Sequence, residues 1–215
     1  ASARSSGLRE LISNVYRGKN NWCLNYASAR SSGLRELISN VYRGILNKNV
    51  KDADFWDCYE SRKMLLNQIG NPSAELTAYC KVAVGKGKNA IYYLTDNTEQ
   101  EKEAIFTFID QYGEEYKRDE LMGILKRVYP DLFAYLQPYR FRNELLDNYF
   151  QDYKYQKVIN KILPEFEAIV LEQAEKREYN LILEPRSSKI EKISTKDSLL
   201  YFMDAMGVEY LGYIM

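Results

Sequence analysis

The chain contains no histidine among its 215 residues, so the commonest general base and the commonest metal ligand are both missing. This absence excludes triads with a histidine base, His-ligated zinc and histidine-based phosphoryl transfer within the chain. Cysteine is scarce as well. Cys23, Cys58 and Cys80 are widely spaced and odd in number, so they fit neither a disulfide framework nor a zinc cluster. This cysteine usage favours a reducing cytoplasm.

Net charge and long apolar segments are also missing. Lys+Arg and Asp+Glu are each 30, so charge gives no reason to expect a nucleic acid or an anionic membrane as partner. No apolar run approaches the ~20 residues that span a bilayer, and we expect no signal peptide. The composition, with 46% hydrophobic and 28% charged residues, is typical of a globular protein with one domain or two small ones.

An exact duplication occupies the N-terminus. Residues 1–18 (ASARSSGLRELISNVYRG) recur without change at residues 27–44. Natural repeat architectures use three or more units that drift in sequence, so we interpret this pair as a recent tandem duplication or an assembly or cloning fault. Each copy carries apolar residues at helical spacing. Because chain termini are loosely held, we expect the first copy to be the one without a packing site.

The remaining chain predicts an α+β fold that is predominantly α-helical. About three short strands are expected, near residues 90–95, 181–184 and 199–204. Expected helices are bounded by capping residues and prolines, with a capping box at Thr98–Glu101, a break or kink at Pro130, and a kink or restart at Pro164. Their ranges are 54–68, 71–84, 98–112, 119–136 and 142–178.

The C-terminal residues indicate the beginning of a further domain. An apolar run, 199–203, is followed by Asp204, by Gly207 and by the start of an apolar helix. Open α/β sheets place ligand-binding groups at the carboxyl ends of buried strands. We therefore interpret Asp204 as a ligand-binding carboxylate at the end of the first strand of a domain that continues beyond Met215.

Three segments resemble the PglZ family of the BREX and phage-growth-limitation systems, which protect bacteria against phage. The first is Ala90-Ile-Tyr-Tyr-Leu-Thr-Asp-Asn-Thr98, followed by Glu101-Lys-Glu103. The second is Glu178-Tyr-Asn-Leu-Ile-Leu-Glu-Pro-Arg-Ser-Ser-Lys189. The third, Leu200-Tyr-Phe-Met-Asp-Ala-Met-Gly-Val-Glu-Tyr210, resembles the family's FxDALGVEY. The similarity covers about 71–215 and does not explain the duplication.

The resemblance implies a parent protein of the alkaline-phosphatase superfamily, which hydrolyses phosphate esters with two divalent metals. It implies that Asp204 is a metal ligand, with zinc as the expected metal of the intact parent. The other ligands and a Ser or Thr nucleophile would follow Met215, so the fragment is expected to be inactive and to bind no cofactor. We therefore expect three parts: a duplicated helical segment (1–50) that the resemblance does not cover, a mainly helical region (51–195) and the start of the phosphatase-like domain (196–215).

Each signal also has a simpler interpretation. Asp204 fits a helix-capping aspartate, and Glu209 fits either a second acid near the site or a complement to a helix dipole. Arg186-Ser-Ser188 fits an anion site or a solvated loop. Gly85-Lys-Gly-Lys88 fits a weak phosphate loop or a plain turn. Tyr139-Arg-Phe-Arg142 mixes stacking and basic groups as single-strand binders do, whereas tyrosines on helical faces usually pack in a core.

Two functions follow as hypotheses. The first is a non-catalytic N-terminal region of a PglZ-type phosphatase, which supports the catalytic domain and docks other phage-defence proteins in the cytoplasm. The alternative is a stand-alone helical module that binds a protein or nucleic acid through its tyrosine-rich helices, the 19 tyrosines being well above normal usage. We expect no membrane partner, and for this region we do not expect nucleic acid.

Overall fold

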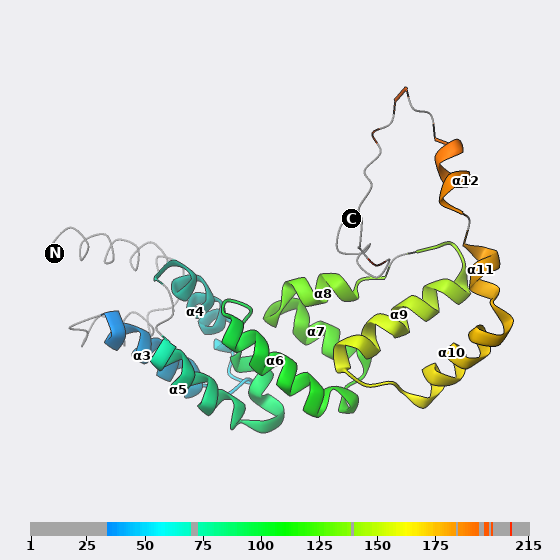
Figure 1. The fold of residues 1–215 in the computed structure, drawn as a ribbon. Helices are drawn as coiled ribbons and strands as arrows, with labels where there is room; N and C mark the ends of the chain where they lie inside the picture. Colours follow the sequence, from blue (N-terminus) through cyan, green and yellow to red (C-terminus); the bar gives the residue numbers. More distant parts are fainter. Residues whose placement is uncertain are drawn as a thin grey trace.

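The computed structural model describes residues 34–69, 73–138, 140–183 and 185–193, together with Lys196, Asp197, Leu199 and Gly207. Every regular element within these residues is helical. In chain order (Figure 1) they are α3 (Leu34–Leu46), α4 (Phe55–Ile69), α5 (Ser73–Val84), the 3₁₀ helix η1 (Gly87–Tyr93), α6 (Glu99–Tyr112), the 3₁₀ helix η2 (Gly113–Glu115), α7 (Arg118–Val128), α8 (Pro130–Leu136), α9 (Glu144–Ile159), α10 (Pro164–Lys176), α11 (Glu178–Ile182) and α12 (Arg186–Glu191).

The prediction of an α+β fold is wrong, because the described residues contain no strand. Residues 90–93 belong to η1, and residues 181–182 belong to α11. The third predicted strand, 199–204, lies outside the described residues except for Leu199, which has no regular structure. The run at 90–94 is buried at nearly every position, so its burial does not alternate as a half-buried strand requires. Short apolar runs of this kind suit a buried helical turn equally well.

Caps and prolines set the helix boundaries largely as the sequence predicts. The Thr98 hydroxyl accepts a hydrogen bond from the Glu101 amide (3.2 Å), which starts α6. Pro130 and Pro164 begin α8 and α10, where a missing amide hydrogen costs nothing. The predicted tract 142–178 is therefore two helices, and the restart at Pro164 is confirmed. Asn160 ends α9 in the left-handed conformation, with φ of 55°.

The hydrophobic core lies between helices α3 to α9. At one end α3 packs on α4 and α5. The middle is crossed by α6, which contacts α5, η1 and α9, while α7 and α8 form a packed pair (Figure 1). One continuous cluster of buried side chains joins these elements. Its members below 2% exposure include Ile38, Ile45, Phe55, Tyr59, Leu66, Ile91, Leu94, Ile105, Ile109, Leu121, Leu125 and Val128. None of the described helices is both long and apolar enough to cross a membrane.

The second copy of the duplication is part of this core. Its described residues, 34–44, lie in α3, whose apolar face is buried against α4 and α5. Ile38 is 0% exposed and Tyr42 is 4% exposed. The first copy, residues 1–18, lies outside the described residues.

Candidate functional site

The metal ligand predicted from the C-terminal motif, Asp204, lies outside the described residues, as does Glu209. The described part of the chain contains no group of three or more His, Cys, Asp or Glu side chains placed to hold a metal ion. The candidate site must therefore be built from other groups that the fold brings together.

A buried ion pair joins α4 to α6. Arg62 of α4 donates from Nη2 to Glu101 Oε1 of α6 over 2.5 Å, and each side chain is 1% exposed. The Glu101 carboxylate also accepts from the Thr95 amide (3.1 Å) and from the hydroxyls of Thr95 (3.1 Å) and Thr98 (3.2 Å). Several donors on one carboxylate offset the loss of water that burial of a charge entails. This network ties α4 to the start of α6.

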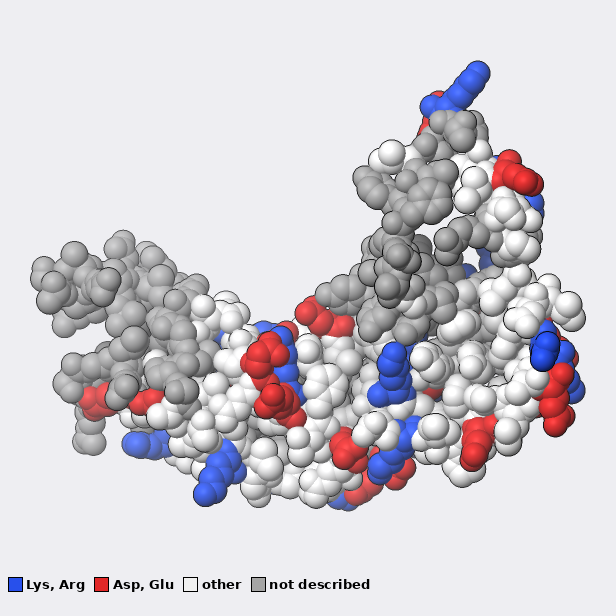
Figure 2. All heavy atoms as spheres, viewed as in Figure 1, with Lys and Arg blue, Asp and Glu red and all other residues white. Residues whose placement is uncertain are grey.

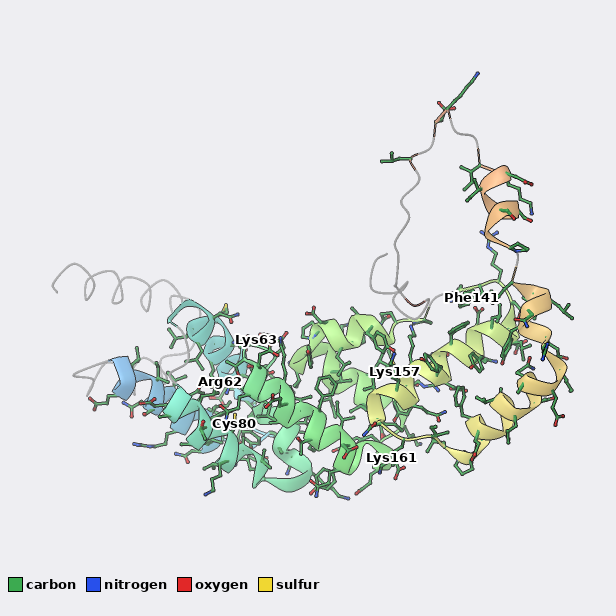
Figure 3. The ribbon with its side chains drawn as sticks, in the orientation of Figure 1. Arg62, Lys63, Cys80, Phe141, Lys157 and Lys161 are labelled. Atoms are coloured by element: carbon green, nitrogen blue, oxygen red, sulfur yellow. The ribbon has the colours of Figure 1, made fainter. Side chains whose placement is uncertain are left out.

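Tyrosine rings complete the surroundings of the guanidinium. The Arg62 Cζ atom lies 4.6 Å from the centroid of the Tyr79 ring and 5.7 Å from that of Tyr42. The two rings stack at 4.2 Å. Arg62 Nε and Nη1 have no hydrogen-bond acceptor among the described residues, so the ring faces are their electrostatic partners. Figure 3 shows Arg62 among α4, α5 and α6.

The same tyrosines hold the segment after η1. The Tyr59 hydroxyl donates to the Leu94 carbonyl (2.7 Å), and the Tyr79 hydroxyl donates to the Tyr93 carbonyl. Burial raises the pKa of both hydroxyls well above the usual value, opposed by the Arg62 guanidinium. These bonds satisfy carbonyls that a strand would have paired with a neighbour. They explain why the sequence 90–95 needs no sheet.

Sequence reasoning recognised Glu101 as a capping-box residue and missed Arg62. The amide half of the box is present, but the carboxylate serves Arg62, 39 residues away. One signal was available: Arg62 occupies an apolar helical stripe together with Phe55, Tyr59 and Leu66, all of them buried. An arginine at such a position needs a buried partner, although spacing alone does not say which one.

The thiol of Cys80 lies beside this network in α5, and the residue is 6% exposed. Burial raises the pKa of this thiol to about 11, and the nearby Glu101 charge adds to the shift. Because the thiolate is the reactive form, the folded chain should protect this residue from alkylation at neutral pH.

We expect iodoacetamide at about pH 8 to modify Cys80 at least about a hundredfold more slowly in the folded chain than in urea, since both thiolate content and access fall. Peptide mass spectrometry over a time course measures both rates. Equal rates in the two states would show that the Cys80 environment is open to water.

An aromatic hollow of about 410 Å³ lies between α6, α8 and α9. Phe106 is 44% exposed there, and its ring meets Tyr129 edge to face at 5.9 Å. Lys157 of α9 lines the same hollow. The full lining is Phe106, Tyr129, Asp131, Leu132, Tyr135, Lys157 and Val158. Aromatic and apolar walls with a few polar tips are typical of surfaces that take up another protein's side chains.

A second hollow, of about 490 Å³, lies between α3 and α5. The stacked Tyr42 and Tyr79 rings form part of its wall, so the hollow borders the rings that surround Arg62. Arg62 and Glu101 line neither hollow. On the face drawn in Figure 2, acidic and basic side chains alternate without a broad area of one sign.

The two segments that the sequence offers as anion or phosphate sites, 85–88 and 186–188, are parts of a turn and of helices. Residues 85–86 form a turn and residues 87–88 begin η1; Lys86 donates to the Leu46 carbonyl (2.9 Å) and Lys88 pairs with Glu115. Residues 186–188 lie in α12 and not in the predicted loop.

Two aromatic residues singled out in the sequence, Phe141 and Tyr149, pack against other aromatic rings. Within 139–142, Tyr139 is outside the described residues, and Phe141 stacks on Phe150 at 5.0 Å. The Tyr149 ring packs between Phe166 and Tyr179, at centroid distances of 5.2 and 4.6 Å. The expectation that helical tyrosines pack against other apolar side chains holds at this position.

Comparison with known families gives one match. Residues 11–112, just under half of the chain, are similar to a family described as a domain of unknown function, DUF7863. No curated protein and no solved structure matches the chain. The matched span includes α3 to α6 and therefore every residue of the Arg62–Glu101 network.

Proposed function

We propose that this chain is the non-catalytic N-terminal region of a PglZ-type phage-defence phosphatase, and that its helices support the catalytic domain and dock other proteins in the cytoplasm. The proposal rests on where the charged and the aromatic side chains of this chain lie. The buried ion pair of Arg62 and Glu101 is sealed from solvent, whereas the accessible hollow between α6, α8 and α9 has three aromatic side chains in its lining. Sealed charges hold helices together, and an open aromatic surface receives a partner.

The resemblance to the PglZ family is what suggests the parent protein. Its first segment, 90–98, carries Tyr93, Leu94, Thr95 and Thr98, which supply carbonyls and hydroxyls to the central network. In this proposal the segment is a structural junction of the N-terminal region. Asp204 would be one ligand of a divalent metal, with zinc expected, and the hydrolytic chemistry would belong to the intact parent.

An assay of the chain with zinc and p-nitrophenyl phosphate should give no turnover, because one carboxylate cannot assemble a metal site. Turnover that is lost on Asp204→Asn would contradict the proposal. The reading frame after Met215 is the second check, and it should encode Asp and His ligands and a Ser or Thr nucleophile.

Docking can be tested with the parent's catalytic domain, expressed separately from residue 196 onward. Phe106→Asp places a charge in the aromatic hollow and should weaken binding of residues 1–195 to that domain at least about tenfold, since an interface anchor is removed. Leu171→Asp is the matched control, because Leu171 is 62% exposed on α10 and lines neither hollow. Calorimetric titration measures both affinities. Equal affinities for wild type and Phe106→Asp would contradict docking at this hollow.

The aromatic hollow also favours the alternative, a stand-alone helical module that binds a protein segment. The two functions differ in what the C-terminus contributes. A stand-alone module keeps its partner binding after deletion of 199–215, whereas the supporting region of a phosphatase loses its covalent link to the catalytic domain.

A further inference from the structure

Helix α3, which contains residues 34–44 of the second copy, packs in a groove between α4 and α5. Its buried anchors are Leu37, Ile38, Val41 and Tyr42, between 0% and 7% exposed. Ile38 and Tyr42 belong to the hydrophobic core cluster, and the Tyr42 ring stacks on Tyr79 of α5 at 4.2 Å. The groove therefore selects a sequence, and that sequence occurs twice in the chain.

The first copy reproduces these anchors without change. Leu11, Ile12, Val15 and Tyr16 stand 26 positions before their counterparts, in an identical stretch of eighteen residues. The identity ends one residue before a fifth anchor. Ile45, 1% exposed, has Lys19 as its counterpart.

We propose that the α4–α5 groove has two competing occupants in one chain, and that the first copy replaces α3 whenever the second copy is displaced. In the exchanged arrangement residues 11–16 occupy the places of residues 37–42. The second copy then leaves the core and becomes part of the connection to α4.

Two differences set the balance between the occupants. Loss of the buried Ile45 side chain favours the second copy by roughly ten- to a hundredfold. The connection to α4 also lengthens from residues 47–54 to residues 21–54, which costs about another tenfold in loop closure. The second copy is thus preferred by about a hundred- to a thousandfold, in agreement with its place in the structure.

Asp substitutions at the matched positions test the exchange in the full chain, with urea unfolding followed by helical circular dichroism. Ile38→Asp puts a charge at a position with 0% exposure and disables the second copy. Rescue by the first copy limits the loss in the folding equilibrium constant to about a thousandfold. The double variant Ile12→Asp/Ile38→Asp has no spare copy and should be at least about tenfold less stable than Ile38→Asp alone.

Lys19→Ile gives the first copy the fifth anchor that it lacks, and should therefore make rescue by the first copy easier to measure. In the Ile38→Asp background it should restore roughly tenfold or more of the equilibrium constant, and Ile12→Asp should abolish that gain. If Ile38→Asp alone proves too unstable to measure, this comparison on the Lys19→Ile background decides the question. If adding Ile12→Asp changes nothing in either background, the proposal is overturned.

Two further measurements distinguish exchange of the two copies from other causes of a change in stability. Ile12→Asp alone should leave stability unchanged, because the first copy is not the preferred occupant. A loss as large as that of Ile38→Asp would show that the first copy has a packing site of its own, and would overturn the proposal. Ile38→Asp also makes peptides from the two copies distinguishable by mass. Amide exchange should then show protection around residue 12 and none around residue 38.

Discussion

Replacing Glu101 by Gln is expected to lower the free energy of unfolding by about 3–5 kcal/mol, the usual effect of removing one partner of a buried ion pair. Gln keeps the size and one acceptor oxygen, so the change removes charge with little loss of volume. The Arg62 guanidinium then remains charged with its counter-ion gone, in a place where its side chain is 1% exposed. Urea unfolding followed by circular dichroism measures the loss.

The pair can be separated from its surroundings with a double-mutant cycle. Arg62→Met leaves the Glu101 carboxylate with only the Thr95 and Thr98 donors, so it should cost a similar amount. The double variant Arg62→Met/Glu101→Gln should be much less destabilised than the sum of the single variants, because neither uncompensated charge remains. Glu172→Gln, which breaks the exposed Lys176–Glu172 pair, is the control and should cause no measurable change.

Additive losses in this cycle would show that Arg62 and Glu101 do not stabilise each other. A loss below about 1 kcal/mol for Glu101→Gln would indicate that water reaches the pair, as it reaches surface pairs. Either result would remove the main support for treating segment 90–98 as a structural junction.

The sequence predicts local boundaries well and the central network poorly, for one physical reason. A cap such as Thr98 and a restart such as Pro164 depend on residues within one helical turn, so the signal is contained in the local sequence. The Arg62–Glu101 pair depends on two helices meeting, and local patterning carries no information about which helices meet. The same limit explains the wrong strand at 90–95, where buried tyrosine hydroxyls from α4 and α5 satisfy the Leu94 and Tyr93 carbonyls.

The duplication shows a different limit of prediction from sequence. Both copies have the same helical pattern, and the sequence favours the second copy only because termini are loosely held. The structure supplies a specific reason: Ile45 follows the second copy and is buried, whereas Lys19 follows the first. In the exchange proposed above, a residue just outside the repeat therefore decides between the two identical segments. The predicted metal ligand, Asp204, stays a prediction, since it lies outside the described residues.

Above about pH 10 the free energy of unfolding should fall by about 4 kcal/mol per pH unit, because three buried tyrosines resist ionisation. Tyr42, Tyr59 and Tyr79 are at most 4% exposed, and burial raises the pKa of each hydroxyl well above the usual value. The Arg62 guanidinium lowers these pKa values by a smaller amount, and the Glu101 carboxylate opposes it. The net direction is upward for all three.

The sign of the effect follows from proton binding in the two states. Below about pH 10 each tyrosine is protonated in both the folded and the unfolded chain, so its contribution to stability is fully present. As pH rises further the unfolded chain releases protons that the folded chain retains. Each tyrosine then contributes a loss of about 1.4 kcal/mol per pH unit, until its folded-state pKa is reached.

Urea unfolding at successive pH values measures the slope, and the near-ultraviolet absorbance of tyrosinate reports ionisation directly. Tyr59→Phe should reduce the slope by about one third, because one of three protons is no longer linked to unfolding. It also removes the hydrogen bond to the Leu94 carbonyl, so the absolute stability changes and only the slope is diagnostic. Ionisation of the three tyrosines should coincide with loss of helical signal. Because the chain has 19 tyrosines and the less buried ones ionise while it is folded, the contrary result is ionisation of all 19 in a chain that stays folded, which would show that water reaches these three hydroxyls.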